Sequence, residues 1–364
     1  MSKARDLADL AKNANDRLDD VATSDGALSN RNVIVNGDMR ISQRGSSFTV
    51  TNAYGLDRWY CRENTDGALT FSQDSESPDG FSKSLKVNVD TADTSIGYNR
   101  SAYLTQRLEG YTIERFAFGG SGAKKITLSF YIRCSVTGKF GGAIVNGFNN
   151  NRSYAFTYDI DTANTWERKT IVFEGDTVGT WNVDNTQEMA IFWSLGGGST
   201  VKKAEGSWDA TANVQSATEA DTELLETSSA TWYITGVQLE VGDTATPFEH
   251  RSYSDELARC QRFFQWNPCG PVSFSGGSNQ AAGGVALPVA LRSTPTITVV
   301  TGTDAIDEFY VQRRDLTNTL TIYDDSPSNV PKTSYSLFGS CEAGATANIT
   351  GCFMAGHWTL DAEL

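Results

Sequence analysis

The sequence predicts an all-β protein: a jelly-roll-like β-sandwich, then a short helix and a smaller C-terminal β domain, preceded by a short N-terminal helix. Aromatic residues make up 11% of the chain and Gly is frequent, a composition typical of pleated strands joined by tight turns. Apolar and polar residues alternate along several short runs, which indicates strands with one buried face. The 364 residues suffice for about two to three domains of roughly 150 residues each.

The first segment, 1–30, differs from the rest of the chain because it lacks aromatic residues and is rich in Asp, Ala, Asn and Lys. Its apolar residues fall at near-heptad positions, which predicts a short helix. About two or three heptads are too few to associate alone, so we expect this helix to be ordered only against a partner chain or an attachment site. The alternative is a frayed terminus. The positions concerned are Leu7, Leu10, Ala14 and Val21.

The β-sandwich is expected over 31–253. Alternation is clearest from Ile126 to Val136 and recurs over 85–89 and 154–160, with Gly, Asn and Asp clusters between the runs. Many short strands separated by turn signals predict an antiparallel sandwich or jelly roll. The alternating runs also place three tryptophans in the core, namely Trp59, Trp193 and Trp232.

Two irregular places are predicted inside this region. Along 231–242 the apolar alternation changes phase at Gly236, which predicts a β-bulge. The stretch 204–227 is acidic and contains no basic residue, which predicts an exposed excursion between strands.

A connecting helix is expected over 254–266, and a second β domain over 267–364. Ser252 or Ser254 precedes acidic residues, which is the chemistry of a helix start. The helical spacing that follows is carried by Leu257, Cys260 and Phe264.

Charge argues against two classes of partner. Acidic residues exceed basic ones by 44 to 30, giving a net charge of −14, whereas nucleic acid and anionic membranes are bound through excess Lys and Arg. No apolar run approaches the roughly 18 residues of a membrane span, and the charged N-terminus does not resemble a secretory signal. We therefore expect neither nucleic acid binding nor membrane insertion.

The sequence supplies little catalytic chemistry. His250 and His357 are the only histidines, and neither stands at zinc-ligand spacing from other ligands. Nucleophile-elbow and phosphate-loop motifs are absent, so we expect no catalytic residue, metal or cofactor. Six cysteines lie far apart and are interpreted as reduced, mostly buried thiols: Cys61, Cys134, Cys260, Cys269, Cys341 and Cys352.

Paired carboxylates are the one feature that would suit a glycoside hydrolase. Asp159 with Asp161, or Asp184 with Glu188, are available. Because acidic residues at loop edges are usually solvated turn residues, we interpret both pairs as turn chemistry.

Several segments together resemble the tail-fibre and receptor-binding proteins of tailed bacteriophages, especially those that infect marine bacteria and cyanobacteria. The most specific segment runs from Gly236 to Arg262, where a final sandwich strand is followed by a corner and a Cys-Gln-Arg-Phe-Phe element at 260–264. The matching strings are RNVIVNGDMRISQRG (31–45), YGLDRWY (54–60), AYLTQRLEG (102–110), TWYITGVQLEVGDTATPFEHRSY (231–253), DELARCQRFFQW (255–266) and LPVALRSTPTITV (287–299).

The resemblance implies a homotrimeric fibre that is part of the virion and assembles in the bacterial cytoplasm. The sandwich would be similar to a carbohydrate-binding module, 1–30 would attach to other virion proteins, and 267–364 would contact the host surface. Trimer contacts are expected from the N-terminal segment and from the helical face at Leu257, Cys260 and Phe264.

The function expected is non-enzymatic attachment to host cells through multivalent binding of surface glycans. One alternative is a tailspike-type polysaccharide depolymerase, against which stands the absence of a solenoid repeat. The other is a structural appendage of tail or capsid that binds no receptor.

The receptor site is expected on loops of the C-terminal domain, 267–364. If adsorption does not need that domain, Trp181 and Trp208 of the sandwich are the next aromatic candidates. The candidate residues are Tyr310 and Tyr323 for stacking on sugars, Arg313 and Arg314 for donating to hydroxyls or acidic sugars, and Asp324 and Asp325 for accepting.

Overall fold

The computed structural model divides the chain into two units, Met1–Arg251 and Ser252–Leu364. In the second unit, side chains are described over 252–266, 287–296 and 359–364. The residues that the structure describes are 30–49, 52–147, 152–266, 271–274, 280–299, 319–323, 332–340, 352–353 and 358–364.

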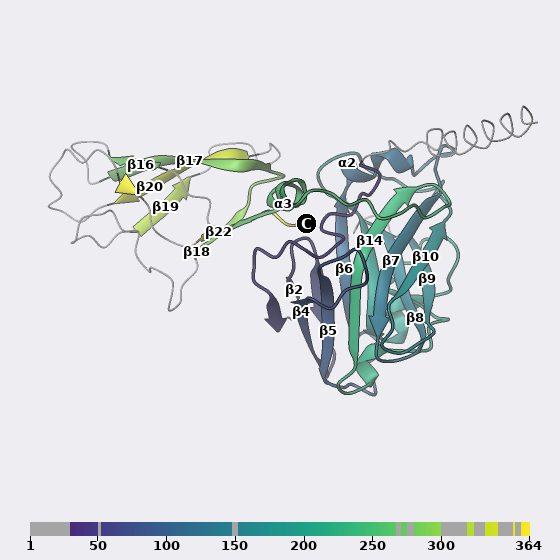
Figure 1. Ribbon diagram of the computed structural model, residues 1–364. Coiled ribbons are helices and arrows are strands. Elements are labelled where there is room, and N and C mark those ends of the chain that lie inside the picture. The colour runs from purple at the N-terminus through teal and green to yellow at the C-terminus, as the bar shows by residue number, and fades with distance from the viewer. Residues whose placement is uncertain are drawn as a thin grey trace, which may run out of the picture. The chain divides into compact units, whose positions relative to one another are not determined.

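The first unit is a sandwich of two six-stranded antiparallel sheets that face each other as two layers (Figure 1). This confirms the all-β sandwich expected from the alternation. Sheet A has the strand order β1 (Ser47–Thr49), β4 (Ala68–Asp74), β5 (Ser84–Thr91), β14 (Thr231–Val241), β7 (Ile126–Cys134) and β10 (Glu167–Phe173). Sheet B has the order β2 (Ala53–Tyr54), β3 (Tyr60–Glu63), β6 (Ser101–Glu109), β11 (Gln187–Gly197), β8 (Gly138–Asn146) and β9 (Ser153–Ile160).

The core lies between the two sheets and is built by the inward positions of the alternating runs. Trp59, Trp193 and Trp232 are all fully buried, as predicted. The ring of Trp193 on β11 lies 5.8 Å from that of Phe130 on β7, so side chains of sheets A and B interdigitate. Burying each such side chain contributes about 1.5–3 kcal/mol.

The predicted bulge is present in β14 at Gly236. Opposite β7, the register moves from Thr235 facing Tyr131 to Gln238 facing Ser129, so two residues of β14 stand against one of β7. Gly236 has φ +61°, a conformation that favours glycine. The bulge therefore explains the change of phase in the sequence, because it moves the next apolar residues back to the inner face.

Short helices and a small sheet connect the strands of the sandwich. They are α2 (Gly110–Ile113), η1 (Glu114–Phe116), η2 (Ser199–Val201), η3 (Leu224–Glu226), and the parallel pair β12 (Lys202–Lys203) and β13 (Ser216–Ala217). The stretch 204–227 is only partly the exposed excursion that was predicted, because Val214, Ala217 and Leu224 are buried.

The three cysteines with described side chains, Cys61, Cys134 and Cys260, are buried and form no disulfide. Burial raises the pKa of Cys61 well above its usual value and that of Cys134 to about 11. Both therefore stay protonated and unreactive at neutral pH.

The second unit begins with α3 (Tyr253–Gln261), whose N-cap is Ser252: its hydroxyl accepts from the backbone N–H of Asp255. The helix is shorter than the expected 254–266. After Gln261 the chain pairs with a strand near the C-terminus, and this ladder replaces further helix. Phe264, expected on the helix, thus lies on a strand.

The remaining strands of the second unit form two sheets. One has the order β15 (Phe264–Trp266), β22 (Trp358–Asp361) and β18 (Thr296–Val299). The other has the order β19 (Thr319–Tyr323), β20 (Lys332–Ser340), β17 (Gln280–Leu291), β16 (Pro271–Phe274) and β21 (Cys352–Phe353).

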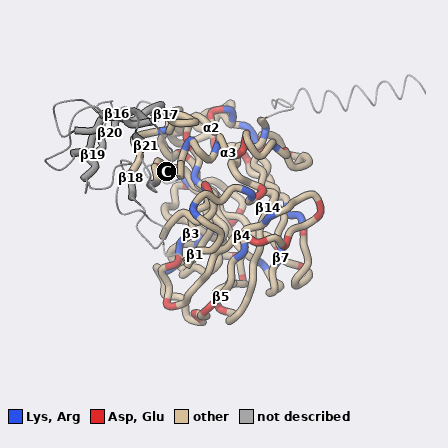
Figure 2. The backbone as a smooth tube through the Cα atoms, turned by 60° about the vertical axis from the view of Figure 1, so that its left-hand side comes forward, with Lys and Arg blue, Asp and Glu red and all other residues tan. Residues whose placement is uncertain are grey.

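Figure 2 shows Lys and Arg positions interspersed with Asp and Glu along the sandwich backbone. Within the described ranges, no helix has the length and apolar character needed to cross a membrane.

Candidate functional site

The residues predicted for receptor binding and attachment fall largely outside the described part of the chain. Tyr323 ends β19, where only the backbone is described, and the other five receptor candidates and all of 1–29 lie outside the described residues. These assignments stay predictions. The residues concerned are Tyr310, Arg313, Arg314, Asp324 and Asp325 for the receptor, and Leu7, Leu10, Ala14 and Val21 for attachment.

The helical face proposed for trimer contacts is described, and its members are not equivalent. Cys260 is fully buried and Phe264 is 3% exposed within the single chain, whereas Leu257 is partly exposed. Cys260 and Phe264 are therefore already covered, and only Leu257 presents surface to another copy.

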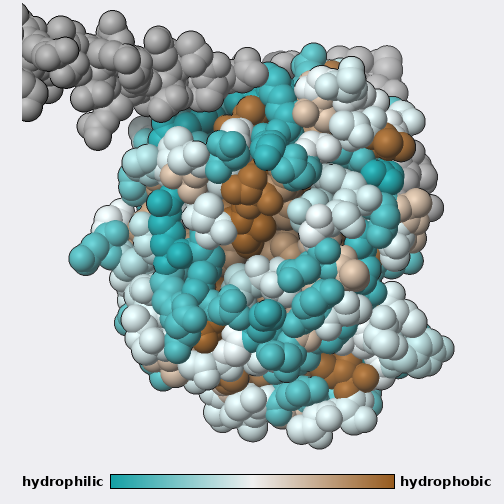
Figure 3. Space-filling model, turned by 90° about the vertical axis from the view of Figure 1, so that its right-hand side faces the viewer, coloured by the Kyte–Doolittle hydropathy of each residue, from teal (hydrophilic) through white to brown (hydrophobic). Residues whose placement is uncertain are grey.

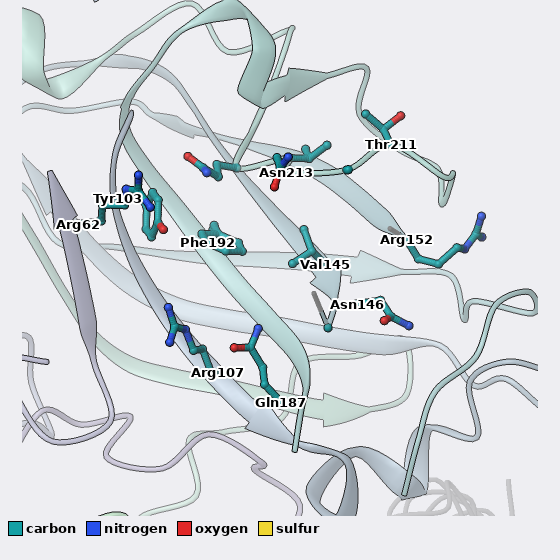
Figure 4. Close-up of a pocket in the computed structure, with 14 residues that line it drawn as sticks. Arg62, Tyr103, Arg107, Val145, Asn146, Arg152, Gln187, Phe192, Thr211 and Asn213 are labelled. Carbon is teal, nitrogen blue, oxygen red and sulfur yellow. The ribbon is translucent and has the colours of Figure 1, made fainter. Parts of the chain in front are cut away.

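A pocket of about 150 Å³ opens on the outer face of sheet B. It crosses four adjacent strands, β3, β6, β11 and β8, which supply Arg62, Tyr103, Phe192 and Val145 (Figure 4). The register explains why these side chains meet: Tyr103 faces Arg62 across β3 and β6, and Phe192 occupies an outward position of β11. The segment 211–215 forms the opposite wall.

The wall segment is held on the sheet by the residues around it. Val214 and Ala217 pack on the small outward side chains of Ala143 and Ala155. Gly141 of β8 is needed for this approach, because a Cβ there would lie 2.1 Å from the Ser216 hydroxyl oxygen. The wall is therefore part of the folded sandwich and keeps a fixed place above the sheet.

The buried amine of Lys203 anchors the start of this loop. Its Nζ donates to the carbonyl oxygens of Ser153 (3.0 Å) and Ser207 (2.9 Å), and lies 2.7 Å from a carboxylate oxygen of Asp209. Backbone hydrogen bonds in both directions between Ser153 and Asp209 tie the loop to β9. The amine is thus fully engaged in structure.

Two residues of the pocket lining carry a buried polar atom without a partner within the protein. Arg62 Nε and Gln215 Oε1 are both buried and make no hydrogen bond to another described residue. Asn146 differs, because it pairs with the core residue Met189 and its side chain lies on the inner face of sheet B. Most buried polar groups in native proteins are paired, so two unpaired atoms in the lining of one pocket indicate groups prepared for water or a ligand. One is a donor and the other an acceptor, a set that matches the hydroxyl groups of a polyol.

An aromatic surface lies beside these polar atoms. The rings of Tyr103 and Phe192 meet edge to face with centroids 4.9 Å apart, and Phe192 is partly exposed. Burial raises the pKa of Tyr103, an effect that nearby Arg62 partly offsets, so its phenol is a neutral donor at physiological pH. Arg107 stacks over the Tyr60 ring at 4.4 Å, which holds its guanidinium at one end of the pocket.

Asp176 fixes the far end of the pocket. This carboxylate, 1% exposed, accepts from Arg152 Nε (3.0 Å) and Nη2 (2.5 Å) and from the indole N–H of Trp181 (3.1 Å). The hydrogen bonds to Asp176 raise the pKa of Arg152 further. Arg152 thus lines the pocket with its charge already paired.

Trp181 and Trp208, the alternative aromatic candidates, belong to a structural cluster. Their rings lie 5.7 Å apart and both pack on Phe118, while Trp208 also contacts Tyr154 of β9. The Trp208 indole donates to the Glu174 carbonyl oxygen at 2.7 Å. Figure 3 faces the side of the sandwich where β9 and β10 form the sheet edges, and shows apolar residues gathered there among polar ones.

The acidic pairs serve structure. Asp184 accepts from the backbone N–H of Thr186 at 2.8 Å, Glu188 accepts from the Asn182 amide at 2.7 Å, and Asp161 binds the Lys169 amine at 3.2 Å. Asp161 and Asp184 lie between strands, as their interpretation as turn residues requires. That interpretation is wrong for the other two, because Asp159 lies on β9 and Glu188 is a buried residue of β11. Within the described part of the chain, no group of three or more His, Cys, Asp or Glu residues is arranged to hold a metal ion.

Sequence reasoning did not find the pocket, because its lining comes from five separate segments. One signal was available: Phe192 stands between the buried residues Ile191 and Trp193, so it occupies the outward position of an alternating strand. A large aromatic residue at a position that normally faces water indicates a contact surface.

No family model matches the sequence, and no curated protein matches it. Among solved structures, the enzymatically active domain of tailspike protein 4 of bacteriophage CBA120 is 12% identical with a TM-score of 0.33, and the match covers 58% of this chain and 22% of that one. The family 11 carbohydrate-binding module of Clostridium thermocellum, solved with a mixed-linked tetrasaccharide, is 12% identical with a TM-score of 0.28 over 56% of this chain and 98% of that one. A family 61 module, solved with a galactotriose, is 11% identical with a TM-score of 0.29, covering 58% and 99% of the two chains.

Proposed function

We propose that the protein is a phage fibre component that attaches to host cells by binding a surface glycan, and that the pocket on the outer face of sheet B is a glycan site. The observation that carries this is that Arg62 Nε and Gln215 Oε1, each without a protein partner, belong to residues that line the pocket beside the partly exposed Phe192. Sugars need both kinds of group, because hydroxyls pair with polar atoms and the ring face packs on an aromatic side chain.

The lining groups favour binding over cleavage. They are guanidinium, amide, hydroxyl, aromatic and aliphatic groups, whereas most glycoside hydrolases use a pair of carboxylates on either side of the scissile bond. The pocket volume of about 150 Å³ is below the roughly 300 Å³ at which drug-sized sites begin. It thus suits a single sugar unit, with the rest of the chain outside.

Attachment to a virion is supported by the sequence resemblance to tail-fibre proteins and by the two-unit β architecture. A site of this size binds weakly by itself. Three copies in one fibre would engage a polymeric glycan together, because the second and third contacts are intramolecular. In this proposal the receptor residues predicted in 267–364 provide a separate contact with the host.

Light scattering of the full chain tests the trimer: a mass of three chains supports it and a monomer at micromolar concentration contradicts it.

A glycan array with the full-length protein tests the pocket. Phe192→Leu keeps apolar volume but removes the ring, and Gln215→Ala removes an acceptor that has no protein partner. Tyr98→Ala is the matched control, since Tyr98 is 69% exposed and does not line the pocket. We expect the unchanged protein and the control to bind the same glycans, and both pocket variants to lose them. Binding that survives both variants, or no glycan bound at all, would contradict the proposal.

A further inference from the structure

We infer that the pocket selects an anionic sugar, one that carries a carboxylate or a sulfate ester; this rests on the proposed glycan binding and names its ligand class. Three of the fourteen residues that line the pocket are arginines, and none of the fourteen is acidic. The whole chain has a net charge of −14, so this local composition opposes the overall balance. A cleft lined by cationic side chains attracts ligands of opposite charge.

The three arginines of the pocket lie at its two ends (Figure 4). At the far end, the guanidinium of Arg152 is paired with the buried carboxylate of Asp176. Arg62 and Arg107 lie at the opposite end, on the neighbouring strands β3 and β6 (Figure 4). The pocket is therefore polarised, and its positive end is beside Tyr103.

Arg62 is the residue that most directly indicates an anionic ligand. Its Nε is buried and has no partner in the protein, although a guanidinium offers donors in a planar fork that fits two oxygens of a carboxylate or sulfate. Tyr103 stands directly opposite Arg62 across the strand pair and adds a neutral phenolic donor to the same place. A neutral hydroxyl satisfies one such donor, whereas an oxyanion satisfies several at once.

Arg107 adds a second guanidinium at the same end. Its guanidinium is 4.4 Å from the centre of the Tyr60 ring, a contact that favours this orientation in the absence of a ligand. Preorganised donors lose less conformational entropy when a ligand binds. The arrangement therefore favours a charged group held between β3 and β6, with the sugar ring extending towards Phe192.

The test compares oligosaccharides that differ only in charge. Trigalacturonic acid and its methyl ester, and a galactose-6-sulfate oligosaccharide and its unsulfated form, are titrated against the full-length protein by calorimetry. Arg62→Gln removes the charge and Arg62→Lys keeps it without the fork. Arg133→Gln is the matched control, because Arg133 lies on β7 of sheet A and also stacks over a tyrosine, Tyr233, at 5.1 Å.

We expect an acidic member of at least one pair to bind about tenfold or more tightly than its neutral form, as hydrogen bonds to a charged group contribute roughly 1.5–3 kcal/mol. Arg62→Gln should abolish that preference, Arg62→Lys should restore part of it, and Arg133→Gln should leave it unchanged. The trigalacturonic acid pair tests recognition of a carboxylate, and the galactose-6-sulfate pair tests recognition of a sulfate ester.

Three results would overturn the inference. Equal affinity for the members of both pairs, or a preference that survives Arg62→Gln, would show that the charge is not recognised here. If neither pair of oligosaccharides binds, while neutral glycans bind on the array and lose binding in Phe192→Leu, the anionic ligand is refuted but the proposed function stands. Failure of every glycan on the array would refute both.

Discussion

The Glu249 carboxylate accepts a hydrogen bond from the backbone N–H of Asn32, with 2.8 Å between Oε2 and N, although 217 residues separate them. Glu249 also contacts the backbone N–H of Asn30, and Arg251 Nη1 donates to the Ile34 carbonyl oxygen at 3.0 Å. The last residues of the first unit thus bind its first described segment. These contacts join segments 31–45 and 231–253 of the chain at one corner of the sandwich.

Replacing Glu249 with Ala should destabilise the sandwich by about 2–3 kcal/mol, because the N–H of Asn32, a residue 4% exposed, would lose its acceptor. Urea unfolding of the first unit measures this. Glu174→Ala is the control: its carboxylate is 66% exposed and binds only Lys125 at the surface, so the change should be within about 0.5 kcal/mol. An equal loss of stability in Glu249→Ala and Glu174→Ala would show that the hydrogen bonds of Glu249 contribute no more than a surface ion pair.

Gly236→Ala should destabilise the sandwich by about 2 kcal/mol or more. A Cβ at this position would lie 2.7 Å from Phe81 Cζ and 2.9 Å from Tyr131 Cδ2, and the backbone has φ +61°. Gly80→Ala separates the steric clash from the backbone strain, because Gly80 has φ +89° with no atom within 4 Å of the added Cβ. Thermal unfolding should show the larger loss for Gly236→Ala; a similar loss would mean that only backbone strain matters.

Asp176→Ala should cost about 3 kcal/mol, since it leaves the guanidinium of Arg152 unpaired and the Trp181 indole without its acceptor. Chemical unfolding followed by tryptophan fluorescence reports both effects. Asp161→Ala provides the comparison, because that carboxylate also binds a cation, Lys169, but is 75% exposed. The account of the far end of the pocket is wrong if the two variants lose equal stability.

The Lys169–Glu167 ion pair should stabilise the protein only at pH values where the Glu167 carboxyl is ionised. Burial alone would raise the pKa of Glu167, but hydrogen bonds from Lys169 and from the backbone N–H groups of Thr162 and Asp161 hold it below its usual value of 4.5. A lowered folded pKa means that this stability is present above the unfolded pKa and is lost as pH falls through the folded one.

Lys169→Gln should therefore lower stability by about 0.5–1 kcal/mol at pH 7. The difference from the unchanged protein should shrink as the pH falls through and below 4.5, where Glu167 becomes protonated. Thermal unfolding at a series of pH values checks this, and a difference that stays constant down to pH 3 would contradict it.

The fold was predictable because its signals are local. The run from Ile126 to Cys134 alternates with period two, and the phase change at Gly236 indicated a bulge that β14 contains. The length of α3 was not predictable, because its end depends on pairing between Phe264 and Asp361, nearly a hundred residues apart. Local patterns do not report such pairings.

The pocket was not predictable for the same reason. Arg62 and Tyr103 meet only through the register of β3 with β6, and the wall at 211–215 reaches them only because Gly141, Ala143 and Ala155 leave room on the outer face of sheet B. The sequence shows each of these residues but not which strands are neighbours. The placement of receptor residues in 267–364 stays a prediction.

The central claim is that a glycan binds on the outer face of sheet B, and a crystal structure of the full-length protein with the glycan that binds best on the array tests it most directly. The account predicts a sugar unit in the pocket, stacked near Phe192 and hydrogen-bonded to Arg62 and Gln215. A glycan bound only elsewhere, for example at Tyr310 and Arg313 of the second unit, with the pocket unoccupied at saturating ligand, would contradict it.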